Sequence, residues 1–281
     1  MSSVAMSAPG RLGKAIEYLQ ELWRRREFTI ALGLGNLKAR NASTSLGLLW
    51  WVLNPLLLGG VYFIVVGILF GGRGRPDDFI IYLLSGMFVF HFTSQSMTGG
   101  ANSIIQNAKL LANLRFPRLL LPISTLIEAL VGFCASLGVL AVMVVITQVV
   151  LDQQYLTPRL FFLPAIVALH VLFNLGLAAI TARLAVPFRD INNLLPYLTR
   201  VWLYLSPIIW PLSLLERAGP TVNRLVAFNP MYDLISLYRS VLLNYPFEPD
   251  YLIGAVVWTV LIGTVGVAVF VRYEGHMVRY L

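Results

Sequence analysis

Charged residues are scarce in this chain, and their scarcity decides its class. Only 12% of its 281 residues are Asp, Glu, Lys or Arg, whereas 58% are hydrophobic. A water-soluble globular domain carries charge on about a quarter of its residues, so that class is excluded. The uncharged stretches are long enough for membrane-crossing helices of ~20 residues, and they lack the short alternating pattern of a transmembrane barrel. We therefore predict an all-α membrane protein.

Reactive and metal-binding residues are equally sparse. The one cysteine, Cys134, lies in an apolar run and has no second cysteine to pair with. The three histidines are far apart in the sequence, and Asp77 and Asp78 are the only adjacent acidic pair. No Gly-x-x-x-x-Gly-Lys-Ser/Thr phosphate loop is present. We predict no catalytic centre, no metal site and no cofactor in this chain, and an integral-membrane transferase is disfavoured.

Six apolar runs, separated by short polar segments, predict six membrane spans. They form a domain of residues 41–281, with spans at about residues 46–70, 79–98, 119–150, 160–182, 191–212 and 251–271. The outer segment 213–249 is too polar and too interrupted to span, so we expect short re-entrant helices there. Within it, Asn229 and Pro230 fit the N-cap and first position of a helix that runs to about Leu243.

Residues 1–40 precede the spans and contain an amphipathic pattern. From Arg11 to Glu27, apolar residues recur at helical spacing with charged residues between them. We predict a helix that lies in the membrane interface, as a surface anchor or as a contact for a partner protein. The residues we assign to such a contact are Trp23, Arg24, Arg25 and Arg26.

The segment 107–122, between the second and third runs, is basic, rich in leucine and interrupted by proline. We predict a short helix at the membrane surface, with its cations in water and its apolar side against another surface. A basic loop that only sets topology is the alternative. The residues that we assign to this surface are Asn107, Lys109, Leu110, Leu111, Leu114, Arg115, Phe116 and Arg118.

The positive charges indicate topology rather than a nucleic-acid partner, because they lie at the ends of the apolar runs. Fourteen of the 21 lysines and arginines fall on the side of the termini, six fall on the opposite side, and Arg200 lies within a span. We therefore predict a multi-pass protein of the plasma (inner) membrane, in contact with its lipids, with both termini and segment 107–122 in the cytoplasm.

Polar and aromatic residues within the spans are the candidates for contact with a transported molecule. Four polar residues lie at similar predicted depth, and we expect a layer in which Glu128 pairs with Arg200, either as a structural ion pair that holds the spans together or as a contact for the phosphate of a lipid carrier. The four are His91, Glu128, Asn174 and Arg200. Arg189 is a candidate for a lipid phosphate. The aromatic candidates for the lining of a conduit are Tyr62, Phe63, Tyr82, Phe88, Phe90, Phe92, Tyr197, Trp202 and Tyr204.

An ordered set of short motifs extends along nearly the whole chain. They are Leu46 to Trp50, Asn54 to Leu56, Phe116 to Arg118, Pro187 to Ile191, Ser206 to Ile208 and Phe228 to Met231. With these motifs the chain resembles the permease subunits of ABC-2 type polysaccharide exporters, which export lipid-linked O-antigen, teichoic acid or galactan. Within that family, the chain resembles the permeases of the mycobacterial galactan exporters.

The resemblance implies a homodimer of six-span permeases with two separate nucleotide-binding ATPase subunits, which hold ATP and Mg. It implies a lipid-linked polysaccharide as the substrate, and it makes segment 107–122 the coupling helix that docks into the ATPase, with the helix from Arg11 to Glu27 beside it. A permease of the same architecture for a drug or a small lipid is the alternative function.

Overall fold

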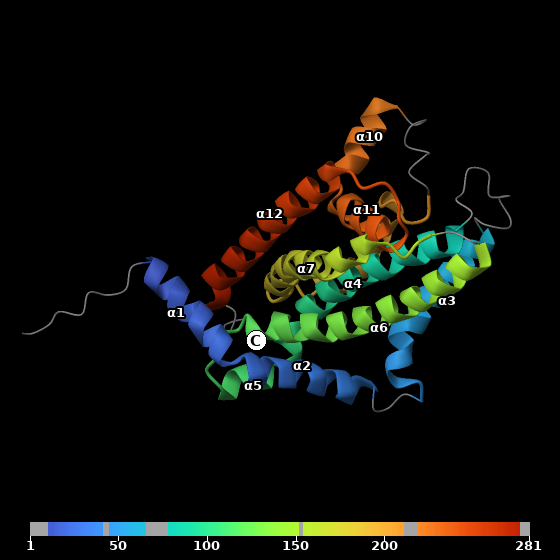
Figure 1. Ribbon diagram of the computed structural model, residues 1–281. Coiled ribbons are helices and arrows are strands. Elements are labelled where there is room, and N and C mark those ends of the chain that lie inside the picture. The colour runs from blue at the N-terminus through green and yellow to red at the C-terminus, as the bar shows by residue number, and fades with distance from the viewer. Residues whose placement is uncertain (1–10, 42–44, 66–77, 152–153, 211–218, 276–281) are drawn as a thin grey trace, which may run out of the picture.

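The computed structural model describes residues 11–41, 45–65, 78–151, 154–210 and 219–275, and every regular element in these ranges is helical (Figure 1). This confirms the all-α prediction. The α-helices are α1 (Arg11–Arg24), α2 (Arg26–Asn41), α3 (Trp50–Tyr62), α4 (Phe79–Gln106), α5 (Ala108–Asn113), α6 (Leu120–Leu151), α7 (Leu163–Ala185), α8 (Ile191–Leu205), α10 (Pro220–Ala227), α11 (Pro230–Leu242) and α12 (Pro249–Tyr273).

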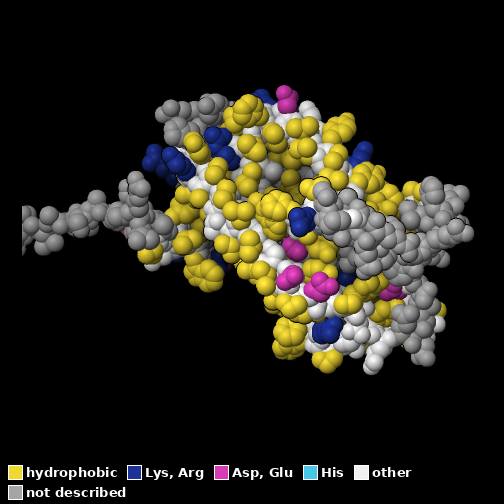
Figure 2. All heavy atoms as spheres, turned by 90° about the horizontal axis from the view of Figure 1, so that it is seen from above, with side chains coloured by type: hydrophobic (Ala, Val, Ile, Leu, Met, Phe, Trp, Pro, Cys, Tyr) yellow, Lys and Arg dark blue, Asp and Glu magenta, His cyan; other side chains and the backbone are white. Residues whose placement is uncertain are grey.

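Four helical segments are long and apolar enough to cross a membrane, and they match the predicted second, third, fourth and sixth spans. They are Phe79–Gln106, Leu120–Val150, Pro158–Ala185 and Pro249–Tyr273. Hydrophobic side chains also cover much of the surface seen from above (Figure 2). Helix α4 continues beyond the predicted second span, which ends at about residue 98, as far as Gln106. Its polar second half stays helical because it packs against α6 and α7.

The other two predicted spans are shorter in the described residues. Helix α3 has 13 residues and α8 has 15. A 15-residue helix rises about 22 Å, less than the ~30 Å of a hydrocarbon core. Helix α8 ends where Ser206 takes up extended backbone before Pro207. The predicted ends of these two spans, at residues 70 and 212, lie outside the described residues, so the count of six spans stays a prediction.

Glycines bring the backbones of α4, α7 and α12 into contact. A Cβ at Gly176 of α7 would overlap the Ile262 carbonyl of α12, and a Cβ at Gly266 of α12 would overlap Gly176. A Cβ at Gly100 of α4 would lie 2.5 Å from the Ala178 carbonyl oxygen of α7. Small residues of this kind let membrane helices pack closely, where dispersion contacts replace the hydrophobic effect. Helix α4 is therefore the buried centre of the bundle, with α6 and α7 against it.

The N-terminal segment differs from the prediction of one helix ending at Glu27. Helix α1 ends at Arg24, and α2 then runs to Asn41 along α6 (Figure 1). A Cβ at Gly33 would lie 2.6 Å from the Ser124 carbonyl oxygen, and Leu37 is buried in the core. Close packing on α6, rather than a strong amphipathic pattern, therefore explains the second helix.

The outer segment contains the predicted helix. Helix α11 begins at Pro230, and the Asn229 side chain accepts a hydrogen bond from the Met231 amide at 3.0 Å, which confirms the predicted cap. It ends at Leu242, and Asn244 then has a positive φ of 53°. Helix α11 is almost completely buried against α4, α7 and α12.

Candidate functional site

The predicted coupling segment divides into a packed part and an exposed part. Leu110, Leu111 and Phe116 are half-buried and pack on the chain's own core. The Phe116 ring lies 5.6 Å from that of Phe28 on α2. The side chains left free for a partner are Lys109, Leu114, which is 51% exposed, and Arg115. Asn107 bonds its own helix, since its amide donates to the Ser103 carbonyl at 2.8 Å.

Glu274, which the sequence analysis did not assign, joins this segment to α1 and α12. The Tyr18 hydroxyl of α1 donates to one Glu274 oxygen at 2.7 Å, and the Arg118 amide donates to the other at 2.5 Å. The Arg118 guanidinium also donates to the Glu274 carbonyl. Burial and the Glu274 charge raise the pKa of Tyr18, which keeps it a donor. The start of α6, helix α1 and the end of α12 are thereby held together.

The predicted contact residues at the end of α1 remain accessible. Trp23 is 70% exposed, and the Arg26 guanidinium lies 5.0 Å from its ring centroid. Arg25 forms a hydrogen-bonded ion pair with Glu21 at 2.6 Å, and Arg24 approaches the same carboxylate at 3.9 Å. The positive charge of this surface is therefore partly balanced within α1.

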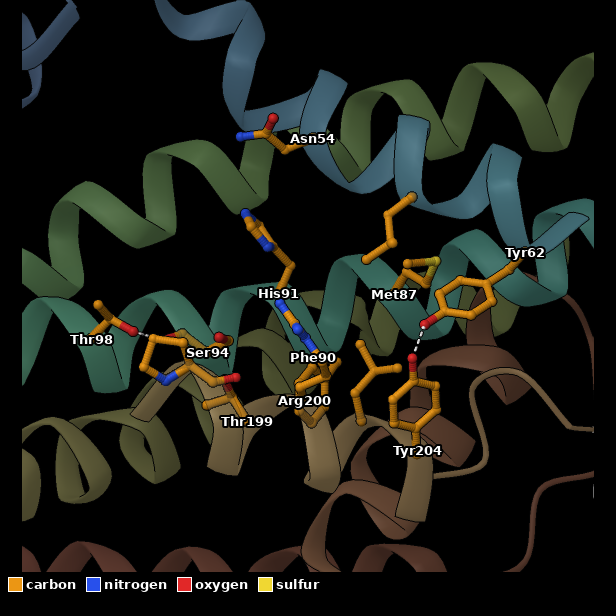
Figure 3. Close-up of a pocket in the computed structure, with 13 residues that line it drawn as sticks. Asn54, Tyr62, Met87, Phe90, His91, Ser94, Thr98, Thr199, Arg200 and Tyr204 are labelled. Carbon is orange, nitrogen blue, oxygen red and sulfur yellow. Dashed lines mark hydrogen bonds between the residues drawn. The ribbon is translucent and has the colours of Figure 1, made fainter. Parts of the chain in front are cut away.

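A pocket of about 470 Å³ opens between α3, α4 and α8 (Figure 3). The Tyr62 hydroxyl of α3 donates to the Tyr204 hydroxyl of α8 at 2.8 Å across its rim. Figure 3 shows His91 on α4 and Arg200 on α8 in the same space. The lining consists of polar, aromatic and apolar residues together: Asn54, Leu58, Tyr62, Met87, Phe90, His91, Ser94, Thr98, Pro196, Thr199, Arg200, Leu203 and Tyr204.

Three of the aromatic residues predicted to line a conduit are in this pocket: Tyr62, Phe90 and Tyr204. Three others, Tyr82, Phe88 and Phe92, are almost fully buried in the core and are not in its lining. They do not line this pocket, because α4 is covered by neighbours on most of its faces, and their assignment to a conduit stays a prediction.

The remaining three aromatic candidates lie beside the pocket. Trp202 packs its ring edge-on against Phe90 at 5.8 Å and donates to Asn229 at 2.8 Å. Tyr197 is exposed on α8, and Phe63 stacks on Phe79.

The predicted polar layer is not one cluster. His91 and Arg200 share the pocket, but Glu128 lines a different one, of about 390 Å³, beside Gln95 and Asn102. The predicted ion pair between Glu128 and Arg200 is therefore not formed. Equal depth along a helix does not set the direction around its axis, and these two side chains point to different neighbours. Asn174 is buried, and its amide has no hydrogen-bond partner within the described ranges.

Two buried polar residues were missed. The His170 ring nitrogens lie 2.8 Å from the Thr93 hydroxyl and 3.3 Å from the Tyr238 hydroxyl. Arg239 of α11 is fully buried, donates to the Pro207 carbonyl at 2.6 Å and to the Tyr82 carbonyl at 3.0 Å, and stacks on the Tyr82 ring. Its position on the apolar face of α11, between Ile235 and Leu242, was the signal in the sequence.

Arg189 is exposed just before α8 begins at Ile191. The neighbouring Asp190 is exposed as well, and no ion pair between the two is observed in the described residues. Arg189 is therefore accessible to a phosphate, and that role stays a prediction.

Sequence comparison relates this chain to known proteins. Residues 29–243 match the sequence profile of the family described as ABC-2 type transporter. The chain is 30% identical over 226 residues to an O-antigen export system permease protein RfbA of Myxococcus xanthus, which covers 80% of this chain and 84% of that protein. It is 24% identical over 249 residues to a protein of the same name in Klebsiella pneumoniae, covering 88% of this chain and 92% of the relative.

Proposed function

Because this chain belongs to the ABC-2 type transporter family, we propose that it is the permease of an exporter that moves a lipid-linked polysaccharide out of the cell. ATP and Mg would be bound and used on a separate nucleotide-binding subunit. The chain is a multi-pass membrane protein, and its relatives are named as O-antigen export permeases. Galactan as the particular polymer stays a prediction.

The position of Arg200 supports a transport path best. Arg200 lies in the apolar helix α8, its side chain is exposed, and it forms no ion pair within the described ranges. A charged side chain facing lipid is expensive, so in membrane proteins such groups face water or a bundle interior. The face of α8 that carries Arg200 therefore borders a hydrated space, to which the pocket with His91, Tyr62 and Tyr204 belongs.

A second copy of the chain would complete this space. The same face of α8 exposes Tyr197, Val201 and Tyr204, and α3 exposes Leu57 and Val61 beside the pocket. We propose that two copies meet along α3 and α8, so that two half-open pockets form one conduit. Aromatic rings in such a wall contact the apolar faces of sugars without fixing their register, which suits a polymer that must slide.

The exposed part of the coupling segment is the proposed contact with the ATPase. Lys109, Leu114 and Arg115 are exposed beyond α4 and carry both charge and apolar area. The orientation predicted from the charges puts them in the cytoplasm, where ATP is available. Glu274 joins the coupling segment to α1 and α12. A movement that the ATPase imposes on the coupling segment would therefore be passed on to the membrane helices.

Thiol accessibility tests the conduit. In a Cys134→Ser background, which removes the only cysteine, Arg200→Cys and Tyr204→Cys are expected to react with a membrane-impermeant thiol reagent. Val260→Cys, on an exposed apolar part of α12, is the matched control and is expected to stay unlabelled in lipid. Equal labelling at all three positions, or labelling of Val260→Cys alone, would contradict a hydrated path beside α8.

Depletion of the chain in its host tests the substrate. Lipid-linked polysaccharide is expected to accumulate on the cytoplasmic side of the membrane. Expression of the native chain should reverse this accumulation, whereas a chain with Lys109→Glu, Leu114→Ser and Arg115→Glu should not. Native and variant chains are purified in parallel to see whether an ATPase subunit accompanies each. If depletion leaves polysaccharide export normal but abolishes efflux of a drug or a lipid, the substrate is that drug or lipid and the proposal is refuted.

A further inference from the structure

A second pocket, of about 260 Å³, lies between α10, α11 and α12 and shares no residue with the α3–α4–α8 pocket. Its lining combines carboxylates with aromatic rings. The carboxylates are Asp233, Glu248 and Asp250, and the aromatic rings are Tyr232, Tyr251 and Trp258. Acidic side chains gather on this face of an otherwise largely hydrophobic surface (Figure 2).

The most informative group in this pocket is Asp233, in the first turn of α11. Its side chain is 5% exposed, and it has no hydrogen bond or ion pair with any described residue. It rests directly on Gly254 of α12, where a Cβ would collide with the carboxylate. Burial and the nearby Asp250 raise the pKa of Asp233 to about 7. The largely buried carboxylate of Asp233 borders the pocket and has no observed protein partner among the described residues, so it is available to a ligand that enters there.

The aromatic side of the pocket is already ordered. The rings of Tyr232 and Tyr251 meet edge to face at 5.5 Å. Trp258 is held by Phe228, whose ring lies 5.0 Å away. A rigid aromatic wall opposite an unsatisfied carboxylate is a pre-organised binding site, because little conformational entropy is lost when a ligand enters.

We propose that this pocket binds a neutral sugar ring, whose hydroxyls donate to Asp233 and its neighbours while its apolar face packs on Trp258. Hydroxyl donors suit carboxylate acceptors, and aromatic faces suit the C–H side of a sugar. Three carboxylates repel an anionic ligand. A metal ion is disfavoured, since no group of three metal-type side chains in the described residues could hold one.

The role of this sugar site rests on the proposed function. The charge pattern predicts that α10, α11 and the start of α12 lie outside the cytoplasm. A polysaccharide leaving the conduit would then pass this face, and the pocket would hold one of its residues weakly as the polymer emerges. The site would be separate from the conduit wall, because the two pockets have no element in common.

Direct binding to the full chain in lipid nanodiscs, without an ATPase, tests the proposal. The probes are methyl β-galactopyranoside, methyl α-mannopyranoside and methyl α-rhamnopyranoside, followed by saturation-transfer NMR titration. We expect saturable binding of at least one glycoside, and about tenfold weaker binding to Asp233→Asn, which loses a charged acceptor. Ala227→Trp, which obstructs the pocket rim without changing a buried group, is expected to abolish it.

Matched controls carry the same types of change away from the pocket. Asp190→Asn is an exposed carboxylate change and Phe161→Ala an exposed aromatic one, and both are expected to bind like the native chain. Absence of binding to the native chain, binding unaffected by Asp233→Asn and Ala227→Trp, or binding of spermidine or Ca²⁺ in place of sugars would each overturn the proposal. If Asp233→Asn fails to fold, the sugar binding of Ala227→Trp decides whether the proposal stands.

The outcome is separable from that of the proposed function. Sugar binding is measured on the isolated chain, so it can be present even if the exported molecule proves to be a drug or a lipid. Conversely, export of polysaccharide with no sugar bound in this pocket would leave the proposed function intact and refute only the second site.

Discussion

Replacing Arg239 with methionine is the perturbation whose result we expect to depend most directly on the observed packing. Methionine has a similar length and no charge. The change removes the guanidinium that links α11 to the Pro207 carbonyl at 2.6 Å and to the Tyr82 carbonyl of α4 at 3.0 Å. It also removes the cation from the Tyr82 ring, whose centroid lies 3.4 Å away. The start of α11 then stays joined to the break after α8 only through its cap Asn229, whose amide donates to the Ser206 hydroxyl at 3.0 Å.

The expected loss in the free energy of unfolding is the difference between two opposing effects. Two hydrogen bonds from a charged donor contribute about 1.5–3 kcal/mol each, so their loss is about 3–6 kcal/mol. Relief of a buried charge offsets several kcal/mol of this, because Arg239 is fully buried. We expect a net destabilisation of about 2 kcal/mol, which for a domain of this size lowers the midpoint of thermal unfolding by roughly 4–8 °C.

The assay is thermal unfolding of the purified chain in one detergent, followed by size-exclusion chromatography of heated samples. Arg239→Lys keeps the charge but cannot bond both carbonyls with a planar fork, so we expect it to lose at least half as much stability. Arg224→Met, on the exposed surface of α10, is the matched control and should unfold like the native chain. An Arg239→Met chain as stable as the native chain, or more stable, would refute the reasoning.

Further predictions concern packing, the cytoplasmic junction and pH. Gly176→Leu should force α7 away from α12 and abolish a monodisperse elution peak, whereas a normal peak would show that the helices can separate without loss of fold. Glu274→Ala removes two acceptor contacts and should lower stability by about 1–3 kcal/mol while loosening α1, measured as faster proteolysis before α2; unchanged proteolysis would argue against this tie. The raised pKa of Asp233, about 7 against ~3.9 unfolded, means that its contribution to stability is greatest below pH 4 and is lost as the pH rises to 7. Asp233→Asn should flatten that dependence, and an unchanged pH profile would count against the burial of this group.

Local sequence was sufficient for the four long helices and for the cap of α11. The apolar runs predicted the four long helices, and Asn229 before Pro230 predicted the start of α11. These features depend on composition, helical period and capping chemistry within a few residues. The second N-terminal helix was missed, because its packing on α6 depends on the fit of Gly33 against Ser124, almost a hundred residues away.

The candidate site was predictable only in its residue types. Sequence reasoning named Tyr62, Phe90, His91, Arg200 and Tyr204, which the fold brings into one pocket. It also named Phe88, two residues from Phe90 on the same helix, which is buried on another side.

By itself, therefore, the sequence determined that this protein lies in a membrane, which stretches form helices, and where polar groups occur along them. Those properties follow from transfer of side chains between water and lipid and from backbone hydrogen bonding, both of which are local. Only the tertiary structure decided that Arg200 lines the same pocket as His91 and not that of Glu128, that Arg239 joins α11 to the Pro207 carbonyl, and that Asp233 is largely buried at a second pocket. The physical reason is that the rotation of each helix about its axis is set by close packing between distant segments, and a one-dimensional pattern does not contain that angle.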